Sequence, residues 1–151
     1  MPRIFTISLI LAAFLAVSAV PGQAFFGLFS SGKSLTLADG KALIPLDGLK
    51  TGEARFFTVP LDGKTIKLFA LKTPDGRVRT AFDACDVCWH AHKGYAQDGD
   101  FMVCVYCGMR FHVMRVGDVS GGCNPAPLPS TVEGKNVVIT EAALRTGAGF
   151  F

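Results

Sequence analysis

The stretches Cys85-Asp86-Val87-Cys88 and Cys104-Val105-Tyr106-Cys107-Gly108 decide what this chain can fold around, because each one separates two thiols by two residues. Four thiolates at this spacing can close around one metal centre, which is either a tetrahedral zinc ion or an iron–sulfur cluster. The glycine of the second stretch allows a tight turn, in which backbone N–H groups can point at the sulfurs. The two pairs therefore predict a metal site and leave the identity of the metal open.

Short apolar runs on both sides of these pairs alternate with Asp-Gly dipeptides, a pattern typical of hairpins. The dipeptides occur at residues 39–40, 47–48, 62–63, 75–76 and 98–99. The predicted strands between them span residues 54–59, 65–71, 78–82, 101–105, 111–116 and 137–140. A single short helix is expected at 141–145, with Thr140 as its N-cap. The sequence therefore predicts an all-β fold, a small sandwich or barrel.

The cysteine pairs occupy loops of this predicted sheet. The first pair follows the strand that ends at Phe82, and the second pair lies at the turn between two later strands. We therefore expect two metal-binding loops to converge at one end of the sheet. A fifth cysteine, Cys123, lies in a third loop rich in Gly and Pro, which could cover the site.

The N-terminal segment has the features of a secretory signal. Arg3 supplies a positive charge, residues 4–20 are apolar or small, and small residues follow at 22–24. We expect residues 1–24 to be a signal peptide; the alternative is an uncleaved anchor. Either way the rest of the chain is exported, to the periplasm or to the outer face of the inner membrane.

The exported part divides into three predicted segments. Residues 25–50 form an N-terminal extension, of which 25–34 is expected to be a mobile spacer; residues 51–141 form a four-cysteine domain, and residues 142–151 form a tail. The formal net charge is only +3, and no basic stripe is present, so nucleic acid is not an expected partner. No Ser/His/Asp set or phosphate-binding loop is visible, which favours a non-enzymatic carrier or metal-binding protein over an enzyme.

The number of cysteines leaves two arrangements open. Thiols outside the cytoplasm usually pair as disulfides. The chain has five cysteines, so a metal on four of them leaves one over, and two disulfides also leave one over.

An ordered series of motifs resembles the membrane iron–sulfur FtrD-like family over about residues 50–139. The residues that carry the resemblance are Ala-Phe-Asp-Ala-Cys-Asp-Val-Cys at 81–88, Lys-Gly-Tyr at 93–95, Met-Val-Cys at 102–104, Cys-Gly at 107–108 and Gly-Gly-Cys-Asn-Pro at 121–125. The resemblance implies an iron–sulfur centre, which we expect to be a [2Fe–2S] cluster on Cys85, Cys88, Cys104 and Cys107. It also implies a bacterial iron-uptake system, with a membrane iron permease and a periplasmic iron-binding protein as partners.

A looser resemblance links the second cysteine loop to Rieske domains. Residues 104–111 are similar to the second Rieske ligand loop with Cys in place of His, and residues 122–128 are similar to its Pro-rich loop. This implies a Rieske-like sandwich. Because thiolates replace both imidazoles, we expect a low reduction potential, roughly −400 mV. Clusters are usually loaded before export through a twin-arginine signal, whereas this N-terminal segment has Arg3 alone.

Two other metals fit the same cysteines. Zinc would make the domain a stabilised binding module without a redox role. Thiolates and thioethers favour Cu(I), and three methionines lie near the second pair, although core packing also explains them. These methionines are Met102, Met109 and Met114.

Several neighbours of the cysteines have predicted roles around the metal. Asp83, Tyr95 and Gly108 are candidates to hydrogen-bond the ligands from behind; for Asp83 a turn-forming role is the alternative. Cys123 is a candidate for an additional ligand or a free thiol. His90 and His92 either flank the centre or are solvated loop residues.

Overall fold

A computed structural model describes residues 32–151. The predicted signal or anchor at 1–24 lies outside the described residues, as does most of the predicted spacer. The last two residues of that spacer differ from the prediction. Lys33–Ser34 form a short strand, β1, that pairs in parallel with β3.

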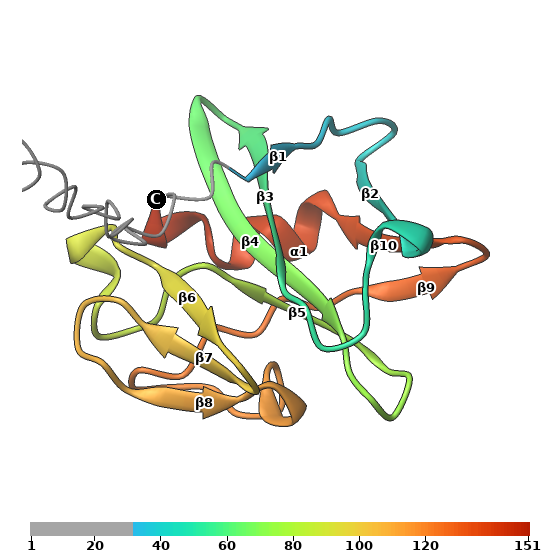
Figure 1. Cartoon of the computed structure of the whole chain (residues 1–151). Coiled ribbons are helices and arrows are strands. Elements are labelled where there is room, and N and C mark those ends of the chain that lie inside the picture. Colours follow the sequence, from blue (N-terminus) through green and yellow to red (C-terminus); the bar gives the residue numbers. More distant parts are fainter. Residues whose placement is uncertain (1–31) are drawn as a thin grey trace, which may run out of the picture.

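Ten strands of the described residues form three sheets (Figure 1). Sheet A contributes side chains to both halves of the molecule. Sheet A has the order β1-β3-β4-β5. Its longer strands are β3 (Arg55–Leu61), β4 (Lys64–Lys72) and β5 (Val78–Phe82). The β3–β4 hairpin closes at Asp62-Gly63, where both residues have positive φ, 49° and 75°. These angles fit the turn that the Asp-Gly dipeptide favours, so this predicted hairpin is confirmed.

Sheet B lies against one face of sheet A. It has the order β2-β10-β9, with β2 at Lys41–Pro45, β10 at Asn136–Thr140 and β9 at Thr131–Glu133. Strands β2 and β9 were not predicted. In β2 only Ala42 and Ile44 are buried, so the apolar signal is too short to recognise without its partner β10.

Sheet C carries the second cysteine pair. It has the order β6-β7-β8, with β6 at Tyr95–Asp98, β7 at Phe101–Cys104 and β8 at Arg110–His112. The prediction of a strand over 111–116 is wrong beyond His112. There Nδ1 of the His112 ring accepts a hydrogen bond from the N–H of Met114 at 3.2 Å, and Val113–Arg115 form a 3₁₀ turn.

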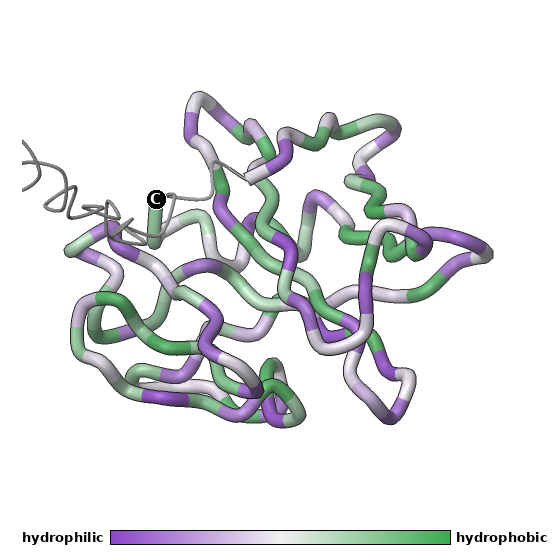
Figure 2. The backbone as a smooth tube through the Cα atoms, in the orientation of Figure 1, coloured by the Kyte–Doolittle hydropathy of each residue, from purple (hydrophilic) through white to green (hydrophobic). Residues whose placement is uncertain are grey.

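Strand β4 separates two apolar cores, because its side chains alternate between the two faces of sheet A. Ile66, Leu68 and Ala70 enter core 1, between sheets A and B. Phe69 and Leu71 enter core 2, beside sheet C. Core 2 also contains buried cysteines. Apolar stretches lie along these strands, and polar stretches lie at many of the turns (Figure 2).

The C-terminal residues pack onto core 1. The predicted helix is present as α1 (Glu141–Thr146), and Oγ1 of Thr140 accepts a hydrogen bond from the N–H of Ala143 at 3.1 Å. The rings of Phe150 and Phe151 lie 6.2 and 6.4 Å from the ring of Phe82. Residues 32–151 are therefore mostly β-sheet with one short α-helix, as the sequence predicts. Within the part of the chain that is described, no helix has the length and apolar character needed to span a bilayer.

Candidate metal centre

All five cysteines lie in two overlapping groups of three. The sulfurs of Cys85, Cys88 and Cys104 lie within 4.8 Å of one another and form what we term the inner triplet. The sulfurs of Cys88, Cys107 and Cys123 meet the same limit and form the outer triplet. Cys88 is the one sulfur common to both. The structure thus brings three of the four predicted ligands together in the inner triplet. It groups the fourth, Cys107, with Cys88 and with Cys123.

The first loop is shaped by hydrogen bonds from its neighbours. Strand β5 ends at Phe82, and the N–H of Asp83 then donates to the carbonyl of Lys67 at 2.9 Å, which holds the loop on β4. The N–H of Cys88 donates to the sulfur of Cys85 at 3.2 Å. A 3₁₀ turn, Trp89–Ala91, follows directly. The first pair is therefore curled so that both sulfurs point to the same side.

The second loop is a tight turn at the end of β7. The N–H of Gly108 donates to the carbonyl of Cys104 at 2.8 Å, and the N–H of Cys104 donates to the carbonyl of Met109 at 2.9 Å. Gly108 has a φ of 75°, which glycine adopts without steric cost. The N–H of Gly108 thus stabilises the turn by donating to a backbone carbonyl and not to a sulfur.

The third loop brings Cys123 over the outer triplet. The phenolic O–H of Tyr95 donates to the carbonyl of Cys123 at 2.6 Å, and the sulfurs of Cys88 and Cys123 are 3.7 Å apart. Further upstream, Nη1 of Arg79 donates to the carbonyl of Val116 at 2.8 Å and to Asp118 at 2.7 Å. The loop is therefore fixed at both ends, as expected for a loop that covers the site.

Burial separates the two triplets. Cys85 and Cys104 are 1% and 2% exposed and belong to core 2, together with Cys88. Cys107 is exposed, and Cys123 is partly exposed. The centre thus has a dry inner side and an outer side that solvent can reach.

The protonation of the thiols follows this division. Burial raises the pKa of Cys88 and of Cys104 above the ordinary value of a thiol. A hydrogen bond from the backbone of Met109 lowers the pKa of Cys107. For Cys123 the hydrogen bond with Cys107 is the main cause of a raised pKa. Because buried thiols resist ionisation on their own, a cation must compensate for the lost protons when the inner sulfurs bind as thiolates.

Asp83 and Tyr95 support the loops from behind. Oδ1 of Asp83 accepts a hydrogen bond from the N–H of Tyr95 at 2.7 Å, and burial raises the pKa of this carboxyl to about 7. The Tyr95 ring lies between the rings of Phe69 and Phe111, at 6.1 and 6.3 Å. Asp83 therefore connects the first cysteine loop to sheet C. The sequence indicated both residues as neighbours of the site but not their hydrogen bond to each other.

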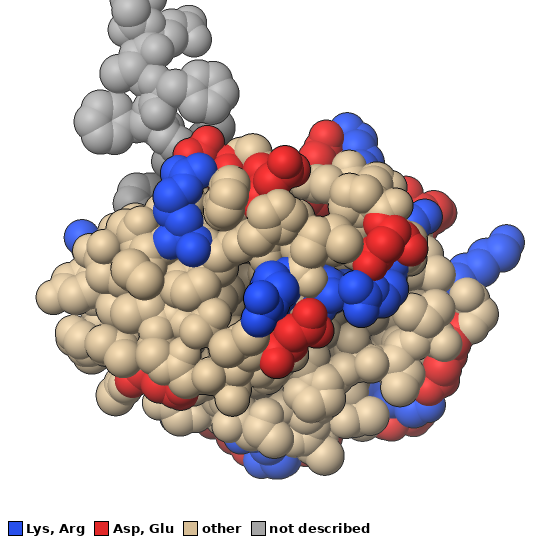
Figure 3. Space-filling model, turned by 90° about the horizontal axis from the view of Figure 1, so that it is seen from below, with Lys and Arg blue, Asp and Glu red and all other residues tan. Residues whose placement is uncertain are grey.

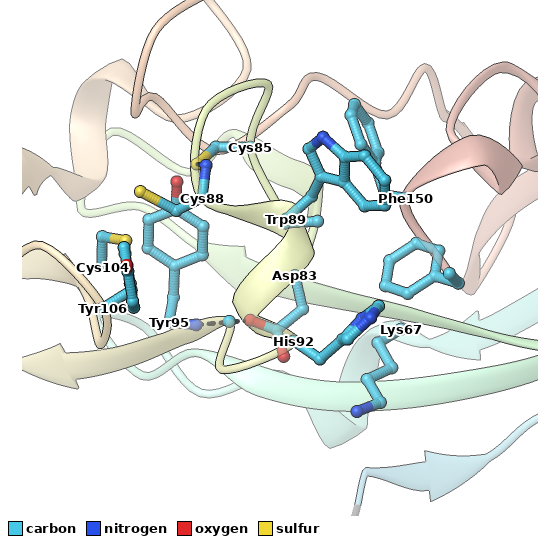
Figure 4. Close-up of a pocket in the computed structure, with 13 residues that line it drawn as sticks. Lys67, Asp83, Cys85, Cys88, Trp89, His92, Tyr95, Cys104, Tyr106 and Phe150 are labelled. Atoms are coloured by element: carbon cyan, nitrogen blue, oxygen red, sulfur yellow. Dashed lines mark hydrogen bonds between the residues drawn. The ribbon is translucent and has the colours of Figure 1, made fainter.

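A pocket lies beside the inner triplet (Figure 4). Trp89, His92 and Phe150 line the side away from the sulfurs, and Lys67 and Asp83 line its floor. Phe150 was missed by sequence reasoning, because its position in a terminal segment gives no local signal that it returns to the first loop.

Most exposed large apolar side chains described in the structure belong to the two cysteine loops. These are Val87, Trp89, Val105, Tyr106 and Met109. His90 joins the loops at the surface, where its ring lies 5.5 Å from the ring of Tyr106. Of the methionines considered for copper, Met102 is fully buried in core 2 and Met109 is exposed. On the face shown in Figure 3, blue and red side chains are intermixed, so neither sign of charge dominates that face.

The donor set fits an iron–sulfur group by its chemistry. The two triplets offer thiol sulfur alone, and three of the five sulfurs lie in an apolar core. Thiolates are the ligands that iron–sulfur clusters require, and they also suit zinc and Cu(I).

Comparison with known proteins gives one positive result. A family model described as membrane iron-sulfur containing protein FtrD-like matches residues 49–151. Neither the curated proteins nor the solved structures contain a match to this chain.

Proposed function

This chain belongs to the FtrD-like family of membrane iron–sulfur containing proteins, and from that membership we propose that it is an exported one-electron carrier of a bacterial iron-uptake system. The convergence of five sulfurs from three loops, with three of them buried in core 2, is the observation that carries this proposal. The family description supports the iron–sulfur character and the link to a membrane. The carrier role is our inference.

Cys85, Cys88, Cys104 and Cys107 are the proposed ligands of a [2Fe–2S] cluster. Cys85, Cys88 and Cys104 come from two loops and form the buried side, while Cys107 forms the side nearer to solvent. When bound, the cluster supplies one-electron transfer and no hydrolytic chemistry. With four thiolates and no imidazole, its reduction potential should lie at roughly −400 mV.

The fold contributes to this role by burying one half of the site and leaving the other half accessible to solvent. Phe69 and Met102 are fully buried in core 2 and exclude water from Cys85 and Cys104. Cys107 is exposed, so electrons would enter and leave on that side. We propose a membrane iron permease and a periplasmic iron-binding protein as the system that this carrier serves.

Zinc is the second candidate, and the compactness of each triplet favours it, because a single tetrahedral ion holds all its sulfurs close together. A tetrahedral ion with metal–sulfur bonds of about 2.3 Å holds neighbouring sulfurs ~3.8 Å apart. The sulfurs of Cys88 and Cys123 are 3.7 Å apart, and each triplet fits within 4.8 Å. A closed zinc site would make the chain a stabilised binding module without a redox role.

Anaerobic purification followed by a visible spectrum and by iron, sulfide and zinc analysis tests the proposal. A brown protein whose bands bleach with dithionite supports the electron carrier. A colourless protein with one zinc supports the binding module, and bound cuprous copper would identify a copper-handling site instead.

Two variants assign the ligands in the same experiment. Cys104→Ser should reduce the iron content on the order of tenfold or more, because it removes a buried ligand. Cys123→Ser is the matched control and should keep the iron, because Cys123 is outside the proposed quartet. Wild-type iron content in Cys104→Ser would refute the ligand assignment.

A further inference from the structure

We propose that Cys123 closes a disulfide with Cys88 when the centre holds no metal, so that the empty site has an oxidised form that cannot be loaded. This inference rests on the proposed role of Cys88 as a ligand. It assigns a modification site to the thiol that the four-ligand centre leaves over.

The distance between the two sulfurs is the first support. They are 3.7 Å apart and not bonded. A disulfide bond has a length of about 2.05 Å, so the sulfurs must approach by roughly 1.7 Å. Side-chain rotation and a small loop shift can supply a movement of this size.

The loop that carries Cys123 is built to allow such a shift. Gly121 and Gly122 precede it with φ values of 92° and 61°, and a Cβ added to either would meet nothing within 4 Å. The hydrogen bond from Tyr95 to the carbonyl of Cys123 keeps the residue near the site meanwhile. The segment can therefore move at its glycines without leaving the outer triplet.

Exposure decides which sulfur of this pair is oxidised first. Cys123 is partly exposed, whereas Cys88 is 7% exposed, so a peroxide in solution reaches Cys123 more readily than Cys88. Cys107 is exposed as well, but the sulfur contact of 3.7 Å joins Cys123 to Cys88. The Cys123 sulfur then takes one oxygen from hydrogen peroxide and becomes a sulfenic acid, with release of one water. The Cys88 sulfur attacks that sulfur, its proton leaves with the hydroxyl as a second water, and the S–S bond forms. Two thiols and one peroxide thus give one disulfide and two waters.

The position of Cys88 gives this reaction its consequence. Since Cys88 is common to both triplets, its disulfide with Cys123 removes one sulfur from the inner triplet and two from the outer triplet. A bond between Cys107 and Cys123 would leave the inner triplet complete. Oxidation at Cys88 is therefore the single event that disables both halves of the site.

Peptide mapping tests the proposal on the full chain. The protein is stripped of metal under reducing conditions, freed of reductant, treated with hydrogen peroxide, alkylated and digested with trypsin. Cys85 and Cys88 lie together in the peptide 80–93, the second pair lies in 94–110, and Cys123 lies in 116–135. We expect a linked product of peptides 80–93 and 116–135, with fragment ions that place the bond at Cys88.

Bonds within the pairs, a bond from Cys123 to any other cysteine, or no bond at all would each overturn the proposal. Cys107→Ser retains both partners and should give the same linked product, whereas Cys123→Ser should not give it. Because the mapping uses metal-free protein, its outcome does not depend on which metal the centre binds, so its failure is distinguishable from failure of the proposed function.

Metal uptake gives an independent readout. The peroxide-treated protein should take up at least tenfold less zinc, used here as the probe ion, than the reduced protein, and dithiothreitol should restore the uptake. Equal zinc uptake by both forms would contradict the inference even if the bond were found.

Discussion

Cores 1 and 2 lie on opposite faces of the same strand, β4, and differ in what fills them. Core 1 is closed by sheet B and by α1, and its buried members are aliphatic or aromatic. Core 2 is closed by the short strands of sheet C and includes Cys85, Cys88 and Cys104. Core 1 can therefore be stabilised by apolar burial alone. In core 2, three of the buried positions hold small thiol side chains that can bind a metal.

This difference teaches that the site is not simply attached to the surface of a finished fold. The strand that anchors core 1 also supplies the wall of core 2, through Phe69 and Leu71. We expect the stability of core 2 to depend on the metal and that of core 1 to be largely independent of it, because a bound metal would cross-link three separate loops. The predictions that follow test this separation.

Neighbouring residues of β4 provide the sharpest test, since Leu68 and Phe69 are both fully buried and face opposite cores. Leu68→Ala should lower the free energy of unfolding by ~2–5 kcal/mol and Phe69→Ala by ~3–5 kcal/mol, because both leave cavities. Metal affinity should fall at least several-fold in Phe69→Ala alone. Urea unfolding and chelator competition measure the two quantities.

The opposite pattern would contradict the separation of the two cores. If Leu68→Ala weakened metal binding as much as Phe69→Ala did, the two cores would be coupled, and metal affinity would depend on packing in either of them.

Two glycines that flank strand β6 give a smaller effect with a matched control. Gly94 and Gly99 both have positive φ, 62° and 56°. A Cβ on Gly94 would clash with the carboxylate of Asp83, whereas one on Gly99 would meet nothing within 4 Å. Gly99→Ala should cost ~1 kcal/mol from backbone strain. Gly94→Ala should cost ~2–3 kcal/mol, because it also disturbs the hydrogen bond between Asp83 and Tyr95.

Metal content measured beside thermal unfolding completes this test. Gly94→Ala should lose metal more readily than Gly99→Ala does, since Asp83 connects the first cysteine loop to sheet C. Equal metal retention in the two variants would show that this connection does not position the site.

Local signals predicted the parts of the fold that depend on local physics. The Asp62-Gly63 hairpin and the Thr140 cap of α1 form as expected, because a two-residue turn and an N-cap are decided by neighbouring residues. Strands β2 and β9 were missed, because each is stabilised mainly by pairing with β10. Strand β6 was missed as well, and it is held by pairing with β7. The end of β8 was wrong, because the 3₁₀ turn after His112 depends on a side-chain contact that apolar periodicity does not reveal.

The cysteines of the candidate site were singled out by their spacing along the chain, but their grouping in space was not predicted. Spacing along the chain associates Cys85 with Cys88 and Cys104 with Cys107. The structure instead places Cys104 with the first pair and groups Cys107 with Cys88 and Cys123. This grouping follows from how the three loops meet over sheet C, which is a long-range property. The hydrogen bond from Tyr95 to the carbonyl of Cys123 has the same origin.

The smallest expected effect concerns Asp75, in the turn between the two strands that both cores share. A hydrogen bond from the hydroxyl of Thr73, with further contacts from Arg77, lowers the pKa of Asp75 from 3.8 to about 2. Because the folded-state pKa is lowered, the ionised carboxylate stabilises the fold above about pH 3.8, and this contribution is lost as the pH falls toward 2. Asp75→Asn should remove it, and the effect is small because an exposed carboxylate is screened by solvent.

Two probes followed from pH 5 to pH 2 make this titration informative about the cores (a range of roughly three units that spans both pKa values). Far-UV circular dichroism reports on the whole fold, and the fluorescence of Trp89, the single tryptophan, reports on the cysteine loops. If the cores unfold together through β4 and β5, the two signals should change over the same pH range in the wild type. In Asp75→Asn the part of this pH dependence that comes from Asp75 should be absent from both signals. Should the Trp89 signal change at a higher pH than the circular dichroism, core 2 would open while core 1 stays folded, and the shared strands would not couple them.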